Sequence, residues 1–109
     1  MEFAEVEGWS TEEQEIAKNA FDAAYVRAIQ QLISSLQSQV GCLGTADSVW
    51  EFHDYLSIQR HTIEGRFSFR VDGILFVFAS LVKDNLLQMD ELAGLDAEKL
   101  AKISAMARF

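Results

Sequence analysis

Hydrophobic residues recur in steps of four along a long stretch that begins shortly after residue 10. Ser10 and Glu13 form a capping-box pattern that predicts the start of a helix. Nothing interrupts the pattern before Gly41 and Gly44, which predict its end. Two adjacent rows with this step form one broad apolar stripe on a helix. The first row is Ile16, Ala20, Ala24, Ala28, Leu32, Leu36 and Val40, and the second is Ala17, Phe21, Tyr25, Ile29 and Ile33.

The predicted helix is too long for the domain that contains it. About 30 residues span about 45 Å in an α-helix, whereas a compact chain of this size has a radius of gyration of about 13 Å. The apolar stripe nevertheless continues to the end of the helix, so something beyond the domain is expected to cover it. A second copy of the chain is the simplest cover, and we predict a homodimer. The alternative is a second long helix of the same chain, which covers part of the stripe in either case.

A second helix is expected after the two glycines. Thr45 or Asp47 can cap its start, and Gly65 predicts its end or a bend. The apolar side is spaced by three and four residues. The residues on this side are Val49, Phe52, Leu56, Gln59 and Ile63.

Residues 66–87 are predicted to form a further helix with an unusually apolar middle. The segment 74–78 is rich in residues that favour β-structure, so a strand is the alternative. We prefer the helix because the chain offers no second strand with which this one could pair.

A short turn and a last helix complete the predicted elements, and no proline interrupts the chain. Leu92 and Gly94 close the turn, and Asp96 caps a helix that carries Leu100 and Ile103. The predicted fold is all-α, with two long helices and a small helical head, in a homodimer. The chain is read as a single helical domain, 1–109, made of a flexible lead (1–9), a long-helix dimerisation part (10–64) and a helical head (66–109).

Charge and cysteine content exclude several classes of function. The formal charge of -8 and the scattered positions of the nine basic residues argue against binding to nucleic acid. Cys42 is the sole cysteine, which is typical of a protein from a reducing compartment. No secretory signal is recognisable, and no apolar run approaches the ~20 residues of a membrane span. We therefore expect a cytoplasmic protein without membrane insertion.

The face of the second helix that points away from its apolar side is chemically unusual. It carries a tryptophan, two histidines, an arginine and an aspartate, namely Trp50, His53, Asp54, Arg60 and His61. Tryptophan and arginine are the types in which binding energy concentrates at protein interfaces. This pattern favours a binding surface for another protein. The alternative is that Trp50 packs under another element of its own fold or dimer.

Helix geometry argues against an enzyme or a metal site on this face. His53 and Asp54 are neighbours whose side chains diverge by about 100°, and His53 lies about 12 Å along the axis from His61. Those separations do not allow shared coordination at about 2 Å per ligand. Asp54 and Arg60 are poor partners within one helix, but they can pair across a two-fold axis between two copies.

The string WEFHDYLS at residues 50–57, continued by Arg60, His61, Ile63 and Gly65, resembles the core motif of the cyanobacterial fluorescence recovery protein family. The resemblance extends over nearly the whole chain. It includes Trp9 and Ser10 before the first helix, Phe21, Tyr25, the aromatic-rich stretch through Phe76, Leu81 and Val82, and the closing Leu92, Gly94, Leu95 and residues 99–102.

The resemblance implies an all-helical homodimer with no catalytic activity and no cofactor, and it leaves open whether dimers pair into a tetramer. It implies a regulator that binds the photoactivated, red form of the orange carotenoid protein through that protein's C-terminal domain. The family accelerates return to the resting orange form and detachment from the phycobilisome. By position, Trp50, His53, Asp54 and Arg60 match the characteristic patch, while Phe76 and Lys102 match the head region. A helical adaptor with another partner is the alternative.

Overall fold

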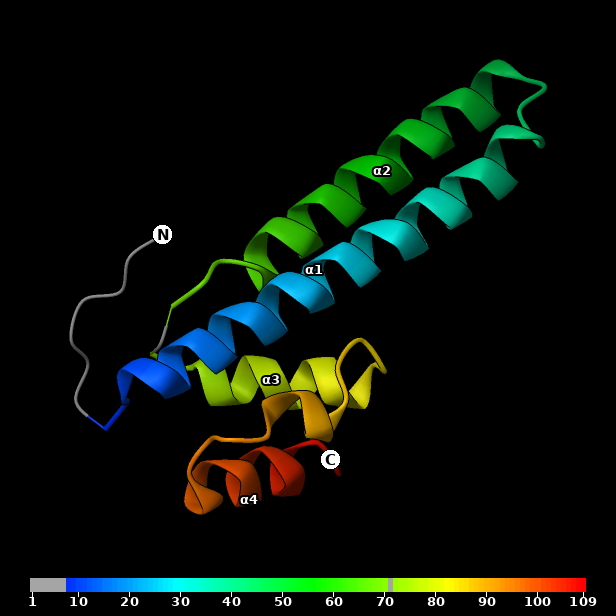
Figure 1. Cartoon of the computed structure of the whole chain (residues 1–109). Helices are drawn as coiled ribbons and strands as arrows, with labels where there is room; N and C mark the ends of the chain where they lie inside the picture. Colours follow the sequence, from blue (N-terminus) through cyan, green and yellow to red (C-terminus); the bar gives the residue numbers. More distant parts are fainter. Residues whose placement is uncertain (1–7, 71) are drawn as a thin grey trace. The chain divides into compact units, whose positions relative to one another are not determined.

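The computed structural model describes residues 8–70 and 72–109, and all of its regular elements in that part are helical (Figure 1). The elements are α1 (Thr11–Val40), α2 (Ala46–Arg66), α3 (Ile74–Lys83), the 3₁₀ turn η1 (Met89–Leu92) and α4 (Ala97–Met106). The predicted all-α class is therefore confirmed. The expected flexible lead falls mostly on residues 1–7, which lie outside the described part.

The ends of the two long helices follow from local side-chain chemistry. At the start of α1, Ser10 Oγ accepts from the Glu13 amide and Glu13 Oε1 accepts from the Ser10 amide, both at 3.1 Å, which confirms the capping box. Of the two candidate caps of α2, Thr45 is the one used, because its side chain accepts from the Ser48 amide at 3.1 Å. α2 ends at Arg66, one residue after Gly65.

The prediction of one helix over residues 66–87 is wrong at both ends. α3 covers only Ile74–Lys83. Before it, Gly73 has a φ of 77°, a left-handed conformation that does not continue a helix. After it, Asn85 has a φ of 60° and ends the helix in the same way. The preference for helix over strand at residues 74–78 is nevertheless confirmed.

The described residues form two compact units. We call residues 8–25 and 69–109 the head unit, and Val26–Ser68 the hairpin unit. The first half of α1 therefore belongs to the head unit and its second half to the hairpin unit.

The head unit holds every buried residue of the described chain. α3 packs against α4, and η1 also contacts α4. Phe69, just before α3, meets Phe21 of α1 edge to face, with ring centroids 4.9 Å apart. The buried apolar residues are Ala17, Ala20, Phe21 and Ala24 of α1, Ile74, Phe78, Ala79 and Leu81 of α3, and Leu86, Leu87, Leu92, Leu95 and Ile103 beyond it.

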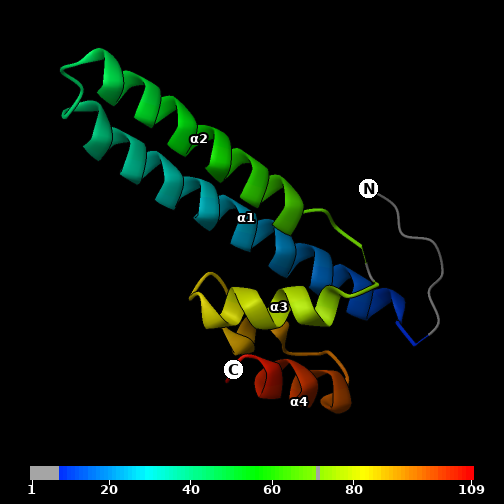
Figure 2. The same ribbon diagram turned by 180° about the vertical axis from the view of Figure 1, so that it is seen from behind.

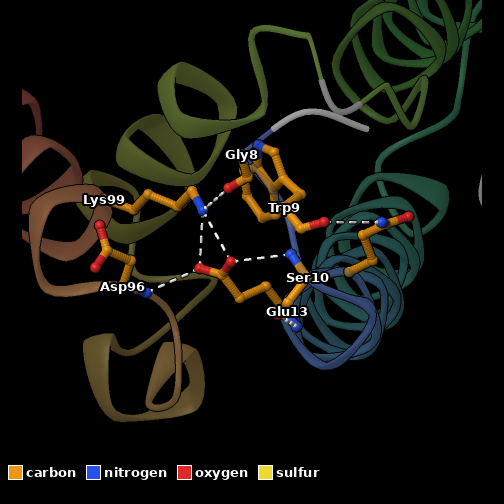
Figure 3. A network of polar contacts seen from close by, with 7 residues as sticks. Gly8, Trp9, Ser10, Glu13, Asp96 and Lys99 are labelled. Carbon is orange, nitrogen blue, oxygen red and sulfur yellow. Dashed lines mark hydrogen bonds and ion pairs between the residues drawn. The ribbon is translucent and has the colours of Figure 1, made fainter. Parts of the chain in front are cut away.

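One carboxylate in the head unit serves the amino ends of two helices (Figure 3). Glu13 caps α1 through the Ser10 amide, and its Oε2 accepts from the amide of Asp96, the N-cap residue of α4, at 2.9 Å. Lys99 Nζ donates to both Glu13 oxygens, at 2.9 and 2.8 Å. The Glu13 and Lys99 side chains are only 12% and 15% exposed. Three donors and two helix dipoles thus favour the ionised carboxylate.

The segment before α1 closes over the same lysine. Lys99 Nζ also donates to the carbonyl of Gly8 and lies 4.4 Å from the centre of the Trp9 ring, a cation–π contact. The Trp9 carbonyl in turn accepts from Nε2 of the buried Gln14 at 3.4 Å. Residues 8–10 are therefore fixed between the first turn of α1 and α4.

The hairpin unit is a pair of antiparallel helices without a buried residue. The second half of α1 and α2 run side by side in both views (Figures 1 and 2), and Ser35 Oγ and Tyr55 Oη are hydrogen-bonded at 2.8 Å. Phe52 and Ile63, on the predicted apolar side of α2, are half-buried. Val49 and Leu56 on that side stay 44% and 38% exposed. The predicted apolar side of α2 is therefore only partly covered.

Two glycine-to-alanine changes should have opposite effects on the free energy of unfolding. Gly94 has a φ of 105°, and an added Cβ would lie 2.5 Å from Cδ1 of Ile16, so Gly94→Ala should destabilise by about 2 kcal/mol. Gly65 lies within α2 with open space around its Cα, so Gly65→Ala should stabilise by about 0.5 kcal/mol. Urea unfolding at one protein concentration measures both. Equal effects of the two changes would contradict this account of Gly94.

The Glu13 carboxylate should make stability depend on pH in the acid range. The hydrogen bond from Lys99 and the amide of Asp96 lower the pKa of Glu13 from 4.5 to about 2. Because the folded pKa is the lower one, the stabilisation is fully present above about pH 5 and is lost as the pH falls from 4.5 towards 2. Glu13→Gln should lower the free energy of unfolding by about 2 kcal/mol at pH 7. That gap should close as the pH approaches 2, and a gap independent of pH would contradict the assignment.

Candidate functional site

The five residues singled out on α2 lie on its surface, and we call Trp50, His53, Asp54, Arg60 and His61 the α2 patch. Trp50, Asp54 and His61 follow one another at helical spacings of four and seven residues, and His53 and Arg60 form the adjacent row at a spacing of seven. Trp50 is 64% exposed, although large aromatic side chains are usually covered. The structure thus brings the predicted residues onto one face, with the tryptophan open to solvent.

Ion pairs within the α2 patch are local and exposed. Arg60 Nε lies 2.7 Å from Oε1 of Glu64, one turn further along the helix. His53 Nδ1 lies 3.2 Å from Oδ1 of Asp54. The expectation that these two neighbours point apart is therefore wrong, because free rotamers let both exposed side chains swing towards each other. Exposed ion pairs of this kind add little to stability. Their side chains can therefore exchange these local contacts for contacts with another protein.

The patch carries the kinds of side chain that protein interfaces commonly use. It offers an indole face, an imidazole–carboxylate pair and a guanidinium on a regular helix. Within residues 8–70 and 72–109, no cluster of three or more His, Cys, Asp or Glu side chains has the geometry to hold a metal ion. Large apolar and planar charged groups of this kind supply contact area and directional hydrogen bonds to another protein.

Phe76 and Lys102 lie in the head unit, and we call them the head face. Phe76 is on α3 and is 70% exposed, while Phe78, two residues on, is completely buried. Lys102 is on α4, with Nζ 3.7 Å from Oε1 of Glu98 and most of its side chain in solvent. The two residues are thus carried by helices that pack on each other. An exposed phenylalanine and a loosely held cation again suit recognition of a protein surface.

The cluster around Lys99 is not predicted by any pattern in the sequence. Glu13 is predicted only as a capping residue, and Lys99 enters as one of the scattered basic residues and as part of the family resemblance over residues 99–102. No local pattern relates two residues that are 86 positions apart. The only signal was an acid at the third position of a helix, which also occurs wherever a capping box is purely local.

Comparison with known proteins connects this geometry to a family. The family model described as photoprotection regulator fluorescence recovery protein matches residues 9–107. The fluorescence recovery protein of Synechocystis sp. PCC 6803 is 41% identical over 100 residues, which is 92% of each chain. This chain belongs to the fluorescence recovery protein family.

Solved structures of the fluorescence recovery protein family have the same fold. The structure of the Fremyella diplosiphon protein covers 93% of this chain with a TM-score of 0.87 and 40% identity, and 99% of that structure is matched. The Synechocystis structure gives a TM-score of 0.86 at the same identity and coverage. The fluorescence recovery protein family is a family of photoprotection regulators. No helix in the described part of this member is long and apolar enough to cross a membrane.

Proposed function

We propose that this chain binds the photoactivated, red form of the orange carotenoid protein at its C-terminal domain. Binding accelerates the return of that protein to its resting orange form and its detachment from the phycobilisome, so that antenna fluorescence recovers. The match to the fluorescence recovery protein family over residues 9–107 carries the proposal. The protein then works in the cytoplasm, beside the phycobilisomes on the thylakoid surface.

Acceleration by this route is conformational and involves no chemical step in the regulator. A binder that held only the activated form would slow its reversion. Acceleration requires that the regulator bind the transition towards the resting state more tightly than it binds the activated state. The exposed Phe76 and Lys102 of the head face support a grip on a surface that activation uncovers. We infer that this grip draws the separated domains of the carotenoid protein together.

We also propose that the hairpin unit pairs with a second copy of the chain. Eight large apolar residues in Val26–Ser68 are exposed, and none in that unit is buried. Three of them, Val26, Ile33 and Val40, follow α1 at intervals of seven residues, which is the spacing of a helix–helix seam. A two-helix hairpin without a buried side chain does not hold its own structure in water.

Charge favours a second copy as the cover of the hairpin unit. No charged residue lies between Arg27 and Asp47, and three basic residues nearly balance four acidic ones within Val26–Ser68. The excess negative charge of the chain lies outside this unit, so two hairpin units do not repel each other strongly. Antiparallel pairing of two hairpins makes a four-helix bundle with two-fold symmetry. We place the α2 patch at or beside the contact between the copies in that bundle, because Asp54 and Arg60 can pair across the two-fold axis.

Self-association is tested by placing a charge on the seam. Ile33→Glu should convert the dimer to a monomer, because it would bury an unpaired carboxylate among apolar side chains. Gln31→Glu is the matched control, since Gln31 is exposed on the same helix and lies about 160° round it from Ile33. Sedimentation equilibrium at several concentrations gives the mass of each variant. A wild-type monomer would refute the dimer, and a wild-type tetramer that Ile33→Glu reduces to monomers would extend it.

Partner binding is tested by mixing the chain with photoactivated orange carotenoid protein and recording the return of its absorbance in the dark. Lys102→Glu should raise the chain concentration needed for half-maximal acceleration about tenfold, because it reverses a contact charge. Arg108→Glu, an identical charge change at another exposed position of the head unit, should change it less than about twofold.

The same experiment separates the proposal from its alternative. If wild-type chain in excess leaves the dark return unchanged, the proposed partner is wrong, and an adaptor for a different protein becomes the better reading. If wild type accelerates the return and Lys102→Glu and Phe76→Ala both act like wild type, the head face is not the contact. Binding to the isolated C-terminal domain of the carotenoid protein tests the site on the partner.

A further inference from the structure

α4 is held in the head unit by two anchors on one of its faces. It is a ten-residue helix, too short to be stable on its own. Ile103 is its one buried residue, and Lys99 lies one turn earlier on the same face. α4 also packs along α3, and Leu100, Ser104 and Met106 are half-buried. Lys99, tied to Glu13, is the polar contact that connects α4 to the start of α1 and restrains the rotation of α4 about its own axis.

Lys102 of the head face follows directly from these anchors. It lies three residues after Lys99 and therefore about 60° round the helix from it. Its own contact with Glu98, at 3.7 Å and largely exposed, does not fix its direction. The direction in which Lys102 points thus depends on the rotation of α4, which the bond between Lys99 and Glu13 helps to fix.

The ion pair between Lys99 and Glu13 is largely shielded from solvent. The two side chains are nearly covered, and Glu13 accepts from the Asp96 amide at the start of α4 as well as from Lys99. The lysine is covered from the other side by the Trp9 ring and the Gly8 carbonyl. The carboxylate therefore holds α4 at two places one turn apart, which prevents both sliding and rotation.

We propose that the Glu13–Lys99 pair is a latch that positions Lys102 for the partner protein without contacting the partner itself. This inference rests on the proposed function, in which Lys102 belongs to the surface that meets the carotenoid protein. Glu13 and Lys99 are positioning residues on this view. Opening the latch should leave the core of the head unit folded and weaken partner binding through Lys102 alone.

Glu13→Gln and Lys99→Met open the latch, while Lys99→Arg should keep it closed because a guanidinium can donate to both carboxylate oxygens. Asp22→Asn is the matched control. It removes one negative charge from the same helix by breaking the exposed Lys18–Asp22 pair. Hydrogen exchange should show faster exchange of the α4 amides in the two opening variants. Slow exchange should persist in α3 and at Ala17–Ala24, and Asp22→Asn should match wild type throughout.

Partner affinity then separates positioning from a general loss of structure. Glu13→Gln should weaken binding about fivefold, and Lys99→Arg and Asp22→Asn should stay within about twofold of wild type. In a double-mutant cycle, Glu13→Gln should have almost no further effect once Lys102→Ala is present, because the latch acts through Lys102. Additive losses of affinity would overturn the positioning role.

Three other outcomes also test whether the Glu13–Lys99 pair positions Lys102. Unchanged α4 exchange in Glu13→Gln would show that the pair is no latch. Faster α4 exchange with unchanged affinity would show that the latch does not serve binding. If the wild-type chain does not bind the carotenoid protein, the proposed function is refuted before any variant is compared. The positioning role of the Glu13–Lys99 pair is then refuted as well.

Discussion

One ionised carboxylate at the amino ends of two helices joins parts of the head unit that are far apart in the sequence. Glu13 caps α1 through the Ser10 amide and receives the Asp96 amide at the start of α4, so the positive ends of two helix dipoles meet at one negative charge. Lys99 neutralises that charge from within α4. Segments from the two ends of the sequence are joined here, and this junction holds residues 8–10, the first turn of α1 and α4 together.

Burial is distributed unequally between the two units, since all the buried residues of the described chain lie in the head unit. The head unit encloses a core of leucines, isoleucines, phenylalanines and small alanines, so it can present rigid helices to a partner. The hairpin unit buries no side chain, and its exposed apolar residues are those that a second copy would cover. A head unit with a core of its own is thus joined to a helix pair whose apolar residues stay exposed, and this contrast is the basis of the proposed dimer.

The α2 patch and the head face fit different tasks. Trp50 and its neighbours lie on a regular helix of the hairpin unit, where their ion pairs are local and exposed. Phe76 and Lys102 lie on two short helices whose placement depends on packing inside the head unit. The α2 motif identifies the family well because its residues are close in sequence. The head face is the better candidate for the partner contact because α3 and α4 hold it in a defined position.

The sequence alone determined what short-range physics controls. The capping box at Ser10 and Glu13, the end of α1 before Gly41 and the common face of Trp50, Asp54 and His61 all follow from residues within a few turns of each other, whereas the sequence left Thr45 and Asp47 as alternative caps of α2. The break before α3 is also local, because Asp72 and Gly73 form a turn-favouring pair, and the prediction of one helix over residues 66–87 overlooked it. Tertiary structure decided the long-range bond of Glu13 to Lys99, and the exposure of Val49 and Leu56 on a side that looked like core. Periodicity shows that a face is apolar, whereas only the packed chain shows whether its own residues cover that face.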